Sequence, residues 1–212
     1  MASDRHPLTP RLTTVVFDIG MVLLDWDPRH LYRKIFTDHG EMEWFLANVC
    51  TFEWNVAQDQ GRPWPEAEAE AIARFPKYAV EIRAFRARWH EMVPGPIAGT
   101  VEILDRLAAS SIPLYAITNF ASDTLRESRA RHPFFEHFHG IVVSGDLGLL
   151  KPDPAIYHRL AADYGLDLAH CVFIDDTDRN VAAARAVGMT ALHFTTPRQL
   201  AKDLVVLGFP AA

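Results

Sequence analysis

The chain of 212 residues carries a formal net charge of -6 and is 49% hydrophobic. This composition predicts a globular protein with one large core, or a core and a smaller second domain, and it excludes a basic nucleic-acid surface. No apolar stretch is long enough to span a bilayer and residues 1–12 contain no apolar signal core, so we expect a soluble cytoplasmic protein without a membrane partner.

The two cysteines, Cys50 and Cys171, are far apart in the sequence and lack the spacing of metal ligands. A disulfide framework or a zinc site is therefore not expected. Both cysteines are predicted to be buried free thiols in a reducing compartment.

The first predicted strand covers residues 15–18 and is followed by an insertion. Residues 28–93 are rich in Trp, Phe, Arg, Glu and Ala at helical spacing and contain no period-2 alternation. Turn residues at positions 26–28 and 94–96 bound this stretch. We therefore predict a helical cap domain of residues 28–93, inserted into an α/β core domain made of residues 1–27 and 94–212.

The remainder of the chain alternates short β-rich runs with helical patterns, which predicts a mainly parallel sheet with crossover helices. Four further strands are expected at residues 113–117, 140–143, 172–174 and 190–193. Helices are expected at residues 100–109, 122–131, 155–164 and 179–187. Right-handed crossovers would place the polar residues that follow the strands on one edge of the sheet.

Carboxylates end two of these apolar runs. Asp18 follows the first strand, and the adjacent pair Asp175 and Asp176 follows a later one. A single aspartate after a strand is commonly a turn or helix-capping residue. Several carboxylates in one crevice repel each other, however, so a cation must compensate them, and magnesium is the simplest choice.

Three other polar residues are expected near this edge. The second core strand ends in Thr118 and Asn119, whose hydroxyl and amide could bond phosphoryl oxygens or cap the following helix. Lys151 precedes a proline-rich turn and a helix, where its ammonium could balance both a substrate phosphate and the aspartates. By itself, a solvated surface lysine is an equally good interpretation.

The order and strand-end placement of these segments resemble the haloacid dehalogenase (HAD) superfamily, specifically phosphatase-like members with a helical cap and an Asp-x-Gly-x-Val first motif. The resemblance covers about residues 12–207. It implies a Rossmann-like, doubly wound parallel sheet of order 3-2-1-4-5, with the Asp18 strand in the centre. It also matches Asp18 to the nucleophile, Thr118 to the second-motif hydroxyl, Lys151 to the third-motif lysine and Asp175–Asp176 to the acidic fourth motif.

For phosphatase members, the resemblance implies in-line attack by Asp18 on phosphorus and hydrolysis of the resulting aspartyl-phosphate. Magnesium would bridge Asp18 and a phosphate oxygen. Asp176 is the expected direct ligand, while Asp175 is outer-sphere or bonded to Lys151. Asn180, on the first turn of the next helix, would support the metal site.

One position departs from the family pattern. Phosphatases of this superfamily usually carry an acid-base aspartate two residues after the nucleophile, where this chain has Gly20. The Gly20 carbonyl can still bind the metal, but loss of an acid-base group costs on the order of 10²–10⁴ in rate for a poor leaving group. The leaving group could be good, as in a sugar 1-phosphate or acyl phosphate, or Asp25 or Asp27 could substitute.

The predicted function is a magnesium-dependent phosphomonoester hydrolase for a small phosphorylated metabolite, with a sugar phosphate as one candidate and a monomer or homodimer as the expected state. A metal-independent 2-haloacid dehalogenase is the enzymatic alternative, although those enzymes have neutral residues in place of Asp175–Asp176. A non-catalytic binding or regulatory module of the same fold is the third. Cap residues that could line the site, or form the cap core, are Trp54, Asn55, Gln58, Asp59, Arg62, Trp64, Arg83 and Trp89. Near the hinge, Trp26 could face the site as well.

Overall fold

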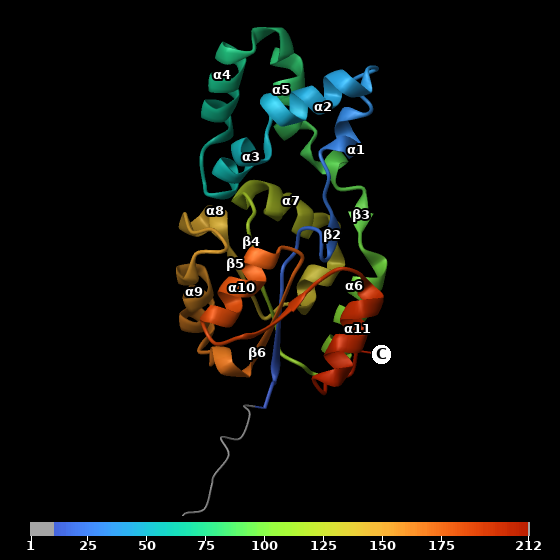
Figure 1. Ribbon diagram of the computed structural model, residues 1–212, viewed down its shortest axis with the longest axis vertical. Helices are drawn as coiled ribbons and strands as arrows, with labels where there is room; N and C mark the ends of the chain where they lie inside the picture. The colour runs from blue at the N-terminus through green and yellow to red at the C-terminus, as the bar shows by residue number, and fades with distance from the viewer. Residues whose placement is uncertain (1–10, 212) are drawn as a thin grey trace, which may run out of the picture.

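The computed structural model describes residues 11–211, so the first ten residues of the predicted core domain lie outside the described residues. A parallel sheet of five strands forms its centre (Figure 1). The strand order is β5-β4-β1-β6-β7, which confirms the expected order 3-2-1-4-5 with the Asp18 strand in the middle. The strands are β1 (Thr14–Phe17), β4 (Leu114–Thr118), β5 (Gly140–Val143), β6 (Cys171–Asp175) and β7 (Thr190–His193).

Both faces of this sheet are covered, which explains why its strands are continuous apolar runs rather than alternating ones. In β1, Val15 and Phe17 belong to one hydrophobic cluster and Val16 belongs to the other. The first cluster includes side chains of α6 (Ala98–Ala109), α7 (Ser122–Arg131) and α11 (Pro197–Val206); the second includes α9 (Pro154–Tyr164) and α10 (Asp178–Ala186). The fold is therefore a three-layer α/β arrangement.

Helices lie over the carboxyl ends of the strands (Figure 1). They are α1 (Arg29–Tyr32), α2 (His39–Asn48), α3 (Phe52–Asp59), α4 (Trp64–Arg74) and α5 (Ala79–Ala87), with short 3-10 turns η1 (Pro76–Tyr78) and η2 (Trp89–Met92). Residues 28–93 are thus helical, as expected. The division of the chain into two domains at these boundaries stays a prediction.

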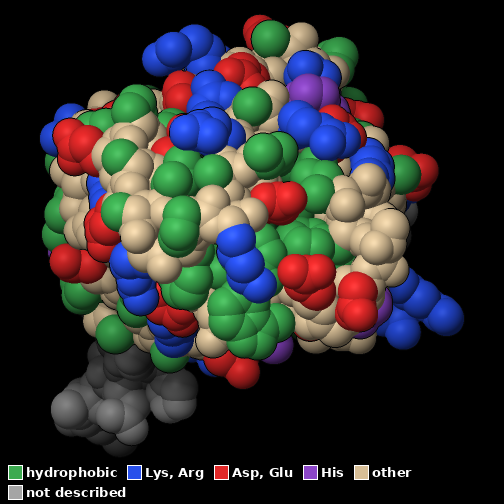
Figure 2. All heavy atoms as spheres, turned by 90° about the horizontal axis from the view of Figure 1, so that it is seen from above, with side chains coloured by type: hydrophobic (Ala, Val, Ile, Leu, Met, Phe, Trp, Pro, Cys, Tyr) green, Lys and Arg blue, Asp and Glu red, His purple; other side chains and the backbone are tan. Residues whose placement is uncertain are grey.

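Aromatic side chains form the interior of this helical cap. Tyr32 lies 5.0 Å from Phe45 and 6.3 Å from Phe85 between ring centroids, and Phe45 lies 5.3 Å from Tyr78. These are the tilted and edge-on arrangements that aromatic pairs favour. The outer face of the cap is mixed, with charged side chains between hydrophobic ones (Figure 2).

A short two-stranded antiparallel sheet joins the cap to the rest of the chain. Strands β2 (Leu24–Asp25) and β3 (Gly95–Pro96) pair here, at the two points where the chain leaves and returns. This two-stranded sheet was not expected, because two-residue strands carry no periodic signal. The remaining short elements are η3 (Pro133–His137), α8 (Ser144–Leu147) and η4 (Leu168–His170).

The sequence predicts two buried free thiols and no membrane-spanning segment. Cys50 and Cys171 are both buried and free, as predicted. Among the described residues, no helix has the length and apolar character needed to cross a membrane.

Candidate functional site

The strand-end residues meet because neighbouring strands are parallel and in register. Phe17 of β1 pairs with Ile174 of β6, so the residues that follow them, Asp18 and Asp175, are adjacent. The Asp18 amide donates to the Ile174 carbonyl at 2.8 Å and prolongs this pairing by one residue. Both aspartates are therefore fixed by the backbone of the sheet, at its carboxyl edge.

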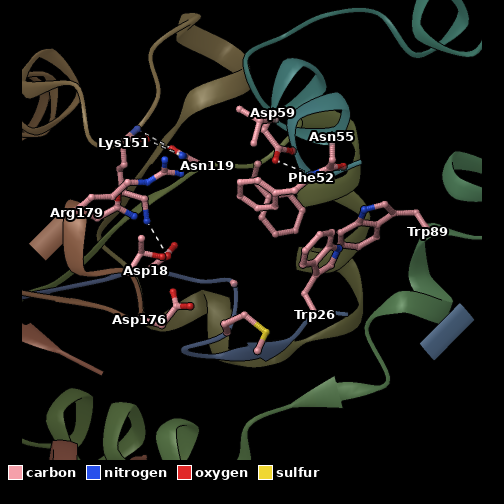
Figure 3. Close-up of a pocket in the computed structure, with 16 residues that line it drawn as sticks. Asp18, Trp26, Phe52, Asn55, Asp59, Trp89, Asn119, Lys151, Asp176 and Arg179 are labelled. Atoms are coloured by element: carbon pink, nitrogen blue, oxygen red, sulfur yellow. Dashed lines mark hydrogen bonds and ion pairs between the residues drawn. The ribbon is translucent and has the colours of Figure 1, made fainter. Parts of the chain in front are cut away.

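Lys151 lies between these two aspartates, and Figure 3 shows it beside Asp18. Its Nζ is 2.7 Å from Asp18 Oδ2 and 2.7 Å from Asp175 Oδ2, and its side chain is 1% exposed. Burial alone would lower the pKa of Lys151, but the two carboxylates outweigh it and raise the pKa above its usual value. The ammonium thus stays charged at neutral pH, and the surface-lysine interpretation is wrong.

Asn119 holds the backbone of Lys151 in place. Its Oδ1 accepts from the Lys151 amide at 2.8 Å, and its Nδ2 donates to the Lys151 carbonyl at 3.0 Å. This pair of bonds explains how a loop residue can present its ammonium reproducibly. The expected contact of Asn119 with a phosphoryl oxygen stays a prediction, since its side chain is already engaged.

Thr118 is the last residue of β4 and is 1% exposed. Its Oγ1 is buried and has no hydrogen-bond partner among the described residues. An unsatisfied buried hydroxyl costs about 1–3 kcal/mol, so such a group favours a bound acceptor. This observation fits the expected role of Thr118 as a donor to an oxyanion.

The two adjacent acids differ in their surroundings. Asp175 is fully buried, and its Oδ1 accepts from the Thr177 amide at 2.8 Å and from Asn180 Nδ2 at 2.9 Å, while its Oδ2 pairs with Lys151. Asp176 is half-buried and lines the cavity described below. Asp176 therefore has the more available carboxylate, whereas Asp175 orients its neighbours.

The cluster of Asp18, Asp175 and Asp176 fits a divalent cation. One carboxylate oxygen of each lies within 4.8 Å of the others, close to the spread of oxygen ligands around one ion. Burial raises the pKa of Asp18 to about 8, the other two aspartates add to this effect, and Lys151 opposes it. With all three carboxylates ionised, the cluster and the Lys151 ammonium would carry a net charge of two minus, which a bound divalent cation would neutralise.

Two further groups beside this cluster suit a metal with bound water. Asn180 Oδ1 is buried without a hydrogen-bond partner among the described residues and could accept from such a water. Gly20 lines the cavity, and a Cβ added there would meet nothing within 4 Å, so its backbone is accessible. The expected metal residues are therefore together, while their ligation itself stays a prediction.

A cavity of about 150 Å³ opens between the sheet edge and the cap. Its polar end carries Asp18, Lys151, Asn119 and Asp176 (Figure 3). Its opposite end is mostly apolar and is formed by Met21, Trp26, Phe52, Val56, Trp89 and Phe120, with Asn55 and Asp59. The site therefore combines a charged reaction centre with a hydrophobic entrance.

The proposed cap residues are only partly correct. Trp26, Asn55, Asp59 and Trp89 line the cavity, whereas Trp54, Gln58, Arg62, Trp64 and Arg83 do not. Trp64 instead donates from Nε1 to Asp123 at 3.2 Å, and Arg62 pairs with Glu70. A helical pattern cannot show which face of a cap helix turns to the sheet, which is why the two groups were not separated.

Asp25 and Asp27 do not line this cavity. Asp25 lies 3.3 Å from His30, and Asp27 accepts from the Arg29 amide at 2.8 Å. Neither is therefore placed to replace the acid-base aspartate that is missing at Gly20.

Asp59 is the cap carboxyl that does enter the cavity. Its Oδ1 accepts from the Ala121 amide at 3.1 Å and its Oδ2 from Asn55 Nδ2 at 2.8 Å. Burial raises its pKa to about 8. Asp59 thus joins the end of α3 to the start of α7 and keeps a titratable group inside the cavity.

Six lining residues were missed from the sequence: Met21, Phe52, Val56, Phe120, Thr177 and Arg179. Met21 and Phe52 are large apolar side chains that are nevertheless 42% and 56% exposed. Exposure of this kind is a tertiary property with no local signal. Arg179 is exposed and supplies a positive charge at the cavity; its position directly after the acidic motif was a signal that could have been used.

Comparison with known proteins agrees with this geometry. A model of the family described as haloacid dehalogenase-like hydrolase matches residues 6–188. Among curated proteins, the sesquiterpene phosphatase astK of Aspergillus oryzae is 33% identical over 182 residues, which cover 85% of this chain and 88% of that protein. Fructose-1-phosphate phosphatase YqaB of Escherichia coli is 23% identical over 193 residues, covering 86% of this chain and 96% of the other.

A solved structure has the same fold. It is the HAD family enzyme bt-2542 of Bacteroides thetaiotaomicron in complex with magnesium and inorganic phosphate, with a TM-score of 0.68 at 19% identity, covering 87% of this chain and 95% of that one. The family match, the strand order and the strand-end residues point to one assignment. The chain belongs to the haloacid dehalogenase-like hydrolase family.

Proposed function

We propose that this hydrolase is a magnesium-dependent phosphomonoesterase that acts on a small phosphorylated metabolite through an aspartyl-phosphate at Asp18. The observation that carries the proposal is the arrangement of Asp18, Asp175 and Asp176 around Lys151, with their oxygens close enough to share one cation. Magnesium, when bound, supplies positive charge to the phosphate oxygens and offsets the repulsion between carboxylates. Asp18, Asp176 and the Gly20 carbonyl would hold it.

In the first half-reaction, a carboxylate oxygen of Asp18 attacks phosphorus in line with the leaving oxygen. The phosphorus–oxygen bond to the leaving group breaks, and the leaving oxygen takes up a proton. Lys151 and the Thr118 hydroxyl would balance the charge of the phosphoryl oxygens. The contact of Lys151 with Asp18 and the Thr118 hydroxyl, unpartnered among the described residues, support these roles. Water then attacks phosphorus, releases inorganic phosphate and regenerates Asp18.

Two relatives support phosphate-ester hydrolysis, because the proteins named above are a sesquiterpene phosphatase and a fructose-1-phosphate phosphatase. The first of these names suits the apolar entrance of the cavity better than a sugar phosphate does. The structural neighbour with magnesium and phosphate supports the choice of metal.

The test is hydrolysis of p-nitrophenyl phosphate, whose good leaving group does not need an acid at position 20. Activity should require magnesium, disappear with EDTA, return on adding the metal, and fall at least about 10⁴-fold in Asp18→Asn. Asp163→Asn, an exposed change on α9, is the matched control and should leave the activity unchanged.

The dehalogenase alternative predicts a different result in the same assay. Metal-independent release of halide from a 2-haloacid, without phosphate hydrolysis, would replace the present proposal. Asp175 and Asp176 argue against it, because two extra carboxylates beside Asp18 would hinder a carboxylate substrate unless a cation were bound.

A further inference from the structure

A second cavity, of about 410 Å³, lies inside the cap next to the reaction centre. Both cavities are lined by Met21, Trp26, Phe52 and Asn55, so the two spaces adjoin across these four residues. A combined site of this size is in the range of small-molecule pockets, roughly 300–1,000 Å³. The catalytic chemistry at Asp18 makes no use of the larger space.

The lining of this cap cavity is suited to hydrocarbon. Leu46, Ala47, Cys50, Phe52 and Phe85 contribute apolar side chains. Such surfaces bind ligands by removing apolar area from water and do not select a hydroxylated chain.

The charged residues of the cap cavity are already paired with each other. Arg29 donates from Nε to Glu43 Oε1 and from Nη2 to Glu43 Oε2, each at 2.7 Å, and its Nη1 lies 3.4 Å from Asp27 Oδ1. A bidentate contact of this kind leaves little reason for Arg29 to recruit a second phosphate or a carboxylate. The charged groups of the cap cavity are therefore paired with each other rather than free to bind an anionic group.

Met21 and Phe52 stand at the junction of the two cavities. Their exposed fractions of 42% and 56% place apolar surface where a ligand could cover it. Met21 also adopts a positive φ of 57°, a conformation uncommon for a side chain of this size and frequent at functional sites. Figure 3 shows Phe52 and Trp26 on the cap side of the space that leads to Asp18 and Asp176.

We propose that the cap cavity binds the hydrocarbon part of an elongated aliphatic phosphomonoester while its phosphate lies at Asp18. This inference rests on the proposed phosphatase activity and adds the substrate class. Met21, Trp26 and Phe52 contact the chain where it passes from one cavity to the other.

The first experiment measures kcat and KM for a series of n-alkyl phosphates, with p-nitrophenyl phosphate as the short reference. Each methylene that enters the cavity should raise kcat/KM by up to about fourfold through a lower KM, until the cavity is full. A flat series with active p-nitrophenyl phosphate hydrolysis overturns this inference alone. Loss of every phosphatase activity overturns the proposed function instead.

The second experiment fills the cavity. Ala47 is an exposed residue of α2 that lines the cap cavity, so Ala47→Trp should fold and obstruct it. KM for dodecyl phosphate should rise about tenfold or more, since several methylenes lose their contacts, while p-nitrophenyl phosphate kinetics stay the same. Ala73→Trp, an exposed change on α4 that lines neither cavity, is the matched control. Equal effects of the two changes, or an equal loss with both substrates, contradict the assignment.

Discussion

The two sides of the cavity are built on opposite principles. On the sheet side, Lys151 and Asp175 are buried and fully bonded, and the register of parallel strands fixes their positions. On the cap side, Phe52 is 56% exposed and Asn55 Oδ1 has no hydrogen-bond partner among the described residues. The sheet side thus fixes its charged groups and leaves the Thr118 and Asn180 oxygens for a phosphate and a metal-bound water, whereas the cap side leaves apolar surface to be covered.

This difference separates the residues that would act on the phosphoryl group from the residues that would select the substrate. Charges that must act on a phosphoryl group need preorganised positions, because the electrostatic stabilisation that they give depends on distance and on a low dielectric. Apolar recognition is tolerant of position and depends on the area that is covered. Changes on the sheet side should therefore affect every substrate, and changes on the cap side should affect some substrates more than others.

The largest effect is expected from Lys151→Gln. This change removes the cation between two buried carboxylates, so kcat should fall on the order of 10²–10³-fold for short and long substrates alike. The melting temperature should also fall, because a buried carboxylate without its partner costs about 3–5 kcal/mol. Lys202→Gln, at an exposed site on α11, serves as the control. A loss of kcat confined to short or to long substrates would contradict the proposed division of roles between the sheet side and the cap side.

An intermediate effect is expected from Gly20→Asp. The Cβ at this position would meet nothing within 4 Å, so the carboxyl can enter the cavity without displacing other groups. It would supply an acid-base group on the sheet side and should raise kcat/KM for alkyl phosphates by about tenfold or more, within the usual range for such groups. p-Nitrophenyl phosphate should gain little because its leaving group needs no proton. Gly20→Asn, which adds similar volume without the acid, should show no such selective gain.

The smallest effect is expected from Asp59→Asn at the boundary between the two sides. Burial raises the folded-state pKa of Asp59 to about 8 from an ordinary value of 3.8. Between these values the unfolded chain loses the proton and the folded chain keeps it, so this group lowers stability as pH rises from about 4 to 8. The melting temperature of Asp59→Asn minus that of the wild type should therefore be larger at pH 9 than at pH 5.

Calorimetry at pH 5 and pH 9 measures this difference. Each kcal/mol of stability corresponds to a shift of about 2–4 °C in the melting temperature. Asp163→Asn, whose carboxylate is exposed, should show no comparable change between pH 5 and pH 9. A pH-independent difference for Asp59→Asn would mean that its carboxyl stays ionised in the folded protein.

Much of the sheet could be predicted because its signals are local. A strand buried on both faces is a continuous apolar run, and residues 140–143 and 190–193 were placed with the bounds of β5 and β7. Polar residues that follow such runs must meet at one edge when the strands are parallel. Asp18, Lys151, Asp175 and Asp176 could be grouped for this reason, together with the family resemblance that implied the strand order.

Other features depend on how separate elements pack. The hold of Asn119 on the Lys151 backbone was not expected, because it depends on the loop before α9 folding against the end of β4. The pairing of β2 with β3 joins residues about seventy positions apart, and these strands are too short to show alternation. Neither the Asn119 contact nor the pairing of β2 with β3 is indicated by the periodicity or the composition of the sequence.

The sequence by itself determined that the strand-end carboxylates meet, since strand periodicity and strand-end polarity are encoded within a few residues of Asp18 and Asp175. Only the tertiary structure decided what surrounds them. The orientation of α3 lets Phe52, Asn55 and Asp59 line the first cavity, and side chains of α2, α3 and α5 line the cap cavity. Such choices follow from the sum of many weak side-chain contacts over the whole cap, so no short motif predicts them.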